Sequence, residues 1–231
     1  MSIKKTVHVF GYNGDIDTGT EDVWSAGGAY TFRATPTIPT IVSGSSDDDA
    51  TDTWARTVRI MGLDSDYMEF TEDVALDGAT PVTLANSYLR INQMIVLTAG
   101  TGAINAGALT VADTDAATIG YMGASEGASD AAIYTIPADY ERGELTLWWI
   151  SKVLSSGNVT ARLQYRPQGG AWITIDKLVV SDAGAATAAG DFIRQPIRIP
   201  PRADVRIRAT STADNAIVWG SFDIDLYEKA G

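Results

Sequence analysis

Residues 159–175 read VTARLQYRPQGGAWITI, and this segment decides the fold class. Its first eight residues alternate between apolar and polar side chains, which is typical of a strand with one buried face. Gly169 and Gly170 then separate this run from a second β-prone run, Trp172–Ile175. Two such runs joined by glycines predict a β-hairpin.

The same period of two recurs along the chain. Residues 56–60 and 67–76 predict a second hairpin closed at 61–66, with Met68, Phe70, Val74 and Leu76 on one face. Further alternating runs are residues 89–97 (Leu89, Ile91, Ile95 and Leu97 inward), 205–209 and 218–226. Roughly ten short strands with turns every 8–12 residues predict an all-β chain, an antiparallel β-sandwich of jelly-roll type.

The expected domain organisation is simple. Residues 1–22 are polar and rich in turn residues, which predicts an extended N-terminal segment, and residues 23–231 then form the β-sandwich. Ala, Gly, Ser, Thr and Asp dominate residues 113–130, so a subdivision near 113–130 is the alternative. We favour one domain, because each half alone supplies few strands for a closed core.

The charge is uneven. The chain carries 29 acidic and 17 basic side chains, and residues 1–115 hold 16 of the acids against 6 bases. Such a surface repels phosphates, so we expect no nucleic-acid partner. No apolar run has the length of a signal-peptide core or of a membrane span, so we expect cytoplasmic folding and no membrane partner.

Catalytic chemistry has little support in the sequence. The single histidine, His8, has no cysteine to act with, and Asp47, Asp48, Asp49 and Asp52 lack the spacing of a calcium loop. We therefore expect no metal, no cofactor and no enzymatic activity. Paired carboxylates keep a polysaccharide-degrading enzyme open, and the nearest candidates are Asp64, Asp66, Glu69, Glu72 and Asp73.

Two groups of side chains are candidates for an interface. Trp148 and Trp149 are consecutive, so a strand must point one into the core and the other outward. The outward ring suits a subunit contact or, together with the other four tryptophans, a sugar-stacking platform. The second group alternates outward on the later strands and suits an acidic neighbouring subunit: Arg162, Arg166, Arg206 and Arg208.

Several segments resemble virion structural proteins of short-tailed bacteriophages of aquatic bacteria. They are TVRIMGLDSDY (57–67), DVALDG (73–78), SYLRIN (87–92), AIYTIPA (132–138), RLQYRPQGGAW (162–172), PIRIP (196–200) and DVRIRA (204–209). The resemblance covers roughly residues 55–226 and brings no catalytic residue with it.

The resemblance implies a capsid decoration or cement protein on the exterior of the virion, made in the host cytoplasm. Its partner would then be the major capsid protein, and particle symmetry suggests a homotrimer. The alternative is a tail fibre, appendage or adaptor protein that binds host glycan or a neighbouring tail subunit.

Overall fold

The computed structural model describes residues 3–153, 157–181 and 187–229, and the regular elements in this part are all strands. The prediction of an all-β chain with antiparallel sheets is therefore confirmed. The strands are β1 (Ile3–Ile16), β2 (Glu21–Asp22), β3 (Thr40–Ser43), β4 (Ala55–Leu63), β5 (Glu69–Ala75), β6 (Val82–Thr83), β7 (Arg90–Ala99), β8 (Leu109–Ala112), β9 (Thr118–Met122), β10 (Ile133–Thr135), β11 (Tyr140–Val153), β12 (Val159–Arg166), β13 (Ile173–Val180), β14 (Thr187–Ile199), β15 (Asp204–Ser211) and β16 (Ala216–Glu228).

The chain forms two compact units. Residues 1–29 and 131–231 make one, which we call the split unit, and residues 30–130 make the other, the inserted unit. The expected organisation was one sandwich over residues 23–231, and a subdivision near 113–130 was the alternative. The later boundary does fall at the end of that segment. The earlier boundary, between residues 29 and 30, has no distinctive composition. It lies within the connection from β2 to β10, both of which belong to the split unit.

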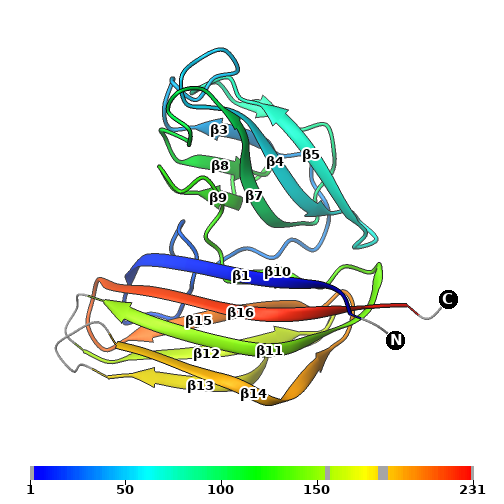
Figure 1. The fold of residues 1–231 in the computed structure, drawn as a ribbon, viewed down its shortest axis with the longest axis vertical. Coiled ribbons are helices and arrows are strands. Elements are labelled where there is room, and N and C mark those ends of the chain that lie inside the picture. Colours follow the sequence, from blue (N-terminus) through cyan, green and yellow to red (C-terminus); the bar gives the residue numbers. More distant parts are fainter. Residues whose placement is uncertain (1–2, 154–156, 182–186, 230–231) are drawn as a thin grey trace. The chain divides into compact units, whose positions relative to one another are not determined.

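The split unit consists of two antiparallel sheets. One has the strand order β1-β16-β11-β14 and the other the order β10-β15-β12-β13, with β2 pairing on β15. In Figure 1 the first sheet lies in front of the second, and both run the length of the unit. We call them the front sheet and the back sheet.

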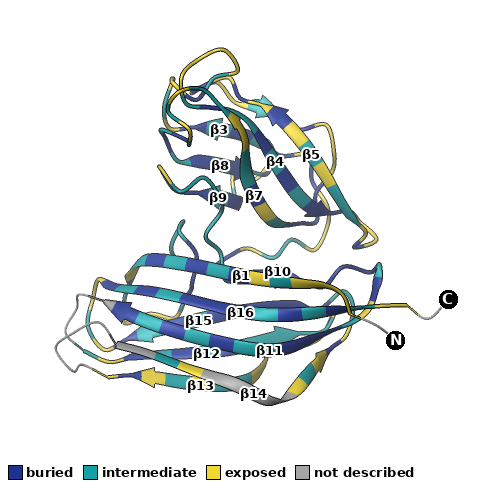
Figure 2. Cartoon of the chain, in the orientation of Figure 1, coloured by how far each residue is buried: buried dark blue, intermediate teal, exposed yellow. Residues whose placement is uncertain are grey.

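One core lies between these two sheets. Trp148 of β11, Phe222 of β16, Leu163 of β12 and Ile207 of β15 are all fully buried in it. Figure 2 shows the alternation of buried and partly exposed residues along β11 and β16. The hairpin predicted from residues 159–175 is confirmed, because β12 and β13 pair across a turn in which Gly169 has a φ of 70°.

The N-terminal residues have a place that differs from the expectation. Residues 1–22 were expected to form an extended segment outside the sandwich, but Ile3–Ile16 is strand β1, paired along its length with β16. The alternation of apolar and polar residues that marks a strand is not recognisable in β1, because Gly11 and Asn13 occupy two of its inward positions. A Cβ atom at Gly11 would lie 2.2 Å from the backbone nitrogen of Ala132, so this strand needs glycine there.

The inserted unit has sheets of order β6-β3-β8-β9 and β5-β4-β7 around its own core. The hairpin of β4 and β5 is confirmed, with Val74 and Leu76 buried, although Met68 is exposed beyond the strand end. Along β7 the expected inward set was wrong after Ile91. Asn92 is an extra residue between two paired positions, a β-bulge that turns Met94 inward instead of Ile95 and leaves Leu97 exposed.

We predict that Gly11→Ala destabilises the split unit by about 1–3 kcal/mol, because the added methyl group collides with the Val23 carbonyl and the Ala132 amide. Gly19→Ala is the matched control, since a Cβ atom there meets nothing within 4 Å. Urea unfolding of both variants measures the difference. Equal midpoints would show that β1 does not pass between these two backbone groups.

Candidate functional site

Basic side chains gather on the outer face of the back sheet. Arg162 on β12 lies directly opposite Arg208 on β15 and Lys177 on β13, so three cations occupy one row across three strands. Neighbouring strands are about 4.8 Å apart, and like charges placed opposite one another destabilise a sheet. A row of this kind needs anionic partners, either from within the chain or from outside it.

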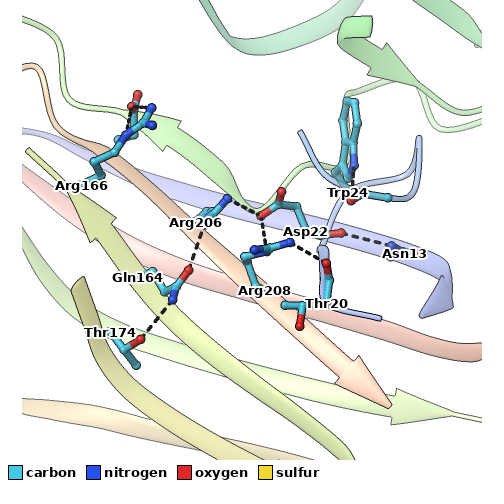
Figure 3. A network of polar contacts seen from close by, with 11 residues as sticks. Asn13, Thr20, Asp22, Trp24, Gln164, Arg166, Thr174, Arg206 and Arg208 are labelled. Atoms are coloured by element: carbon cyan, nitrogen blue, oxygen red, sulfur yellow. Dashed lines mark hydrogen bonds and ion pairs between the residues drawn. The ribbon is translucent and has the colours of Figure 1, made fainter. Parts of the chain in front are cut away.

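Asp22 supplies the internal partner for one end of this face. Its carboxylate is fully buried and lies 3.4 Å from Arg206 Nη1 and 3.5 Å from Arg208 Nε (Figure 3). Gln164 accepts a hydrogen bond from Arg206 Nε at 3.2 Å and donates one to Thr174. Asp22 comes from β2, which follows β1, so the N-terminal part of the chain completes the site.

Trp172 covers two of the guanidinium groups. Its ring centroid lies 3.6 Å from Arg206 Cζ and 4.7 Å from Arg166 Cζ, which are favourable distances for cation–π contacts. Burial lowers the pKa of Arg206 to about 10, and the nearby Asp22 acts in the opposite direction. Arg206 therefore stays charged at neutral pH and is held in place from both sides.

The four arginines predicted for an interface thus have different roles. Arg166 forms an ion pair with Asp204 at 2.6 Å, while Arg206 and Arg208 contact Asp22. Within the described residues, the side chain of Arg162 makes no ion pair or hydrogen bond, and the ammonium group of Lys177 makes none either. Arg162 and Lys177 are therefore the cations that remain available to a partner. Lys177 was missed in the sequence because it stands alone on its strand.

The two consecutive tryptophans point to opposite faces, as their alternation predicts. Trp148 is fully buried, and its indole Nε1 donates a hydrogen bond to Asp176 at 2.9 Å. Trp148 therefore belongs to the core. Trp149 is partly exposed on the outer face of the front sheet, where it faces Phe10 at a centroid distance of 6.4 Å.

The carboxylates of the inserted unit serve local structure. Asp64 accepts hydrogen bonds from backbone amides of its own turn, Glu72 accepts from Ala85, Asn86 and Tyr88, and Asp73 pairs with Arg59 at 2.7 Å. These hydrogen bonds lower the pKa of Glu72 against the opposing effect of burial, which is the largest single influence.

The aspartates of residues 47–52 accept hydrogen bonds from the chain itself. Asp48 is buried and accepts from Ser43 Oγ and from the amides of Ala55, Ala106 and Gly107. Asp49 accepts a hydrogen bond from the amide of Thr51, and Asp52 accepts one from the amide of the adjacent Thr53. In the described part of the chain, no group of three or more His, Asp or Glu side chains is placed to hold a metal ion. His8 lies on the outer face of the front sheet, 2.5 Å from Asp223.

The charge is divided between the two units. The inserted unit holds 14 acidic and 4 basic side chains, and the split unit holds 15 and 13. The surplus negative charge therefore belongs almost wholly to the inserted unit. Among the residues that the structure describes, there is no helix of the length and apolar character needed to cross a membrane.

Comparison with known proteins assigns no family. No protein-family model and no curated protein matches the chain. Among solved structures, the chain is similar to the VP2 subviral particle of infectious bursal disease virus, with 10% identity over 98% of this chain and 72% of that chain and a TM-score of 0.27. The Gx strain of the same virus gives 12% identity over 98% and 73%, with a TM-score of 0.26. TM-scores this low establish no common fold, and no function follows from them.

We predict that Asp22→Ala lowers the free energy of unfolding by about 3–5 kcal/mol, because it leaves the charges of Arg206 and Arg208 without their buried partner. Arg162→Ala, on the same sheet face, should change it by about 0.5 kcal/mol or less. Urea unfolding followed by circular dichroism compares the two. If Asp22→Ala left the free energy of unfolding unchanged, the ion pairs of Asp22 with Arg206 and Arg208 would not be formed.

A second prediction concerns Asp48. Asp48→Asn puts an N–H group against donors that now point at a carboxylate, and should destabilise the inserted unit by about 1–3 kcal/mol. Asp47→Asn, at an exposed position of the same loop, should have almost no effect. Melting curves with calcium and with a chelator should coincide for the unsubstituted protein. A calcium-dependent rise in Tm would contradict this account of the loop.

Proposed function

We propose that the chain is a structural protein of a virus particle, a capsid decoration or cement protein of a bacteriophage, and that it acts by adhesion without a catalytic step. One observation carries the proposal. The strand orders β1-β16-β11-β14 and β10-β15-β12-β13 support it, because we interpret them as the topology of a jelly roll whose chain carries the inserted unit between β2 and β10. Jelly rolls build viral capsid and lectin domains.

The outer face of the back sheet is the proposed docking surface. Arg162 and Lys177 present two cations in register on a chain that is otherwise strongly acidic. Charge complementarity across an interface sets orientation and excludes wrong partners. The proposed partner is an acidic surface of the major capsid protein. Each docking contact would bury on the order of 1,200–2,000 Å².

Copy number tests this proposal directly. Purified particles of the phage that encodes the chain are separated on a gel, and this protein is counted against the major capsid protein. Hundreds of copies per particle would agree with a decoration protein. About a dozen copies would favour the alternative, a tail fibre, appendage or adaptor protein. Absence from the particle would reject both versions.

A charge-reversal variant tests the docking surface. We predict that Arg162→Glu combined with Lys177→Glu leaves folding intact and lowers binding to undecorated capsids at least tenfold. Lys4→Glu combined with Lys5→Glu makes the same charge change at exposed positions of β1 and should bind nearly as well as the unsubstituted protein. Raising the salt concentration should weaken binding of the control pair and of the unsubstituted protein. Equal loss in both double variants would show that net charge, and not this face, governs docking.

A further inference from the structure

The outer face of the front sheet carries two neighbouring pairs of aromatic rings. Phe10 and Tyr12 lie on β1, Trp219 on β16 and Trp149 on β11, and all four are partly exposed. Tyr12 and Trp219 are directly opposite each other, with ring centroids 5.8 Å apart. Phe10 and Trp149 are 6.4 Å apart. We call these four rings the aromatic floor.

Small residues between the rings allow them to cover the sheet. Ser221 lies between Phe10 and Trp149 in one cross-strand row, and Gly190 follows Trp149 in the same row. A Cβ atom at Gly190 would lie 2.9 Å from Trp149 Cβ, so a larger residue would displace this ring. The Ser221 hydroxyl is fully buried at this position and has no hydrogen-bond partner among the described residues.

A polar pocket of about 590 Å³ adjoins the aromatic floor, and Tyr12 belongs to both. Its lining includes Tyr12, Asp15, Asp17, Glu21, Ser25 and Gly28. This volume lies within the range of small-ligand sites. The carboxylate of Asp15 is exposed and makes no interaction within the described residues, so it is available to a ligand.

The pocket is held in shape by hydrogen bonds beneath it. Asn13 is buried, donates to the Asp22 carbonyl at 3.1 Å and accepts from the Asp15 amide at 2.9 Å. Glu21 accepts from the amides of Asp17 and Gly28. Gly28 has a φ of 66°, and a Cβ atom there would meet nothing within 4 Å, so this rim borders open space. Hydrogen bonds that hold these residues in place before binding lower the entropy cost of ordering them around a ligand.

We infer that the aromatic floor and this pocket together form a binding site for a neutral oligosaccharide. The C–H face of a hexose ring is apolar and stacks on the negative face of an aromatic ring, while its hydroxyl groups donate to carboxylates. The three carboxylates of the pocket repel acidic sugars and phosphates, which argues against an anionic ligand. This inference goes beyond the proposed particle role. Its failure would leave the copy number in the particle unchanged.

Titration of the full chain tests the inference. The neutral probes are maltohexaose, cellohexaose and the hexamer of N-acetylglucosamine, and polygalacturonate is the acidic comparison. We expect at least one neutral probe to bind and to quench tryptophan fluorescence, and polygalacturonate not to bind. Absence of binding by all three neutral probes, or a preference for polygalacturonate, would overturn the proposal.

Variants locate the site. Trp219→Ala should weaken binding of the neutral probe at least tenfold, and Asp15→Ala at least threefold. The exposed position of Asp15 keeps this second variant folded, so the test does not depend on the packing of Trp219. Trp54→Phe, in the inserted unit, and Glu228→Ala, at an exposed acid of β16, are the matched controls and should bind normally. Binding that survives both site variants would contradict the assignment to this face.

Discussion

The pairing of β1 with β16 is the constraint on which the rest of the structure depends. It joins the two ends of the chain, from Ile3 opposite Tyr227 to Ile16 opposite Ala216. Because this pairing places both ends of the chain in one sheet, residues 30–130 form an insertion with a core of their own. The same pairing fixes the segment that follows β1, and so brings Asp22 to Arg206 and Arg208.

Closure of the split unit also separates two surfaces of different chemistry. The outer face of the back sheet is basic, and three of its arginines are held by Asp22 and Asp204. The outer face of the front sheet bears the aromatic floor. Two sheets that share one core turn their outer faces in opposite directions. A molecule that docks through the basic face therefore presents its aromatic face away from the partner.

Strand alternation made much of this fold predictable from the sequence. It gave the hairpins at residues 56–76 and 159–175 and the opposite directions of Trp148 and Trp149. It failed where a local feature breaks the period. After the bulge at Asn92, the residues of β7 that were expected to point inward point outward. The pattern of β1 was not recognised because its inward position 11 must be glycine, since neighbouring backbone atoms leave no room for an apolar side chain.

The candidate site was predictable only in part. The alternation of residues on the later strands predicts that the arginines point outward. Asp22, which pairs with Arg206 and Arg208, lies far from them in the sequence, so only the fold reveals these contacts. The pocket beside Tyr12 likewise depends on Asn13 and on glycine turns, which carry no distinct pattern.

An electron cryo-microscopy reconstruction of the virus particle proposed to carry this chain tests the central claim most directly. The account predicts this chain on the outside of the shell, with Arg162 and Lys177 against acidic capsid side chains and Trp149 and Trp219 turned to solvent. A reconstruction that lacks the chain, or that seats the aromatic floor on the capsid and leaves Arg162 in solvent, would contradict it.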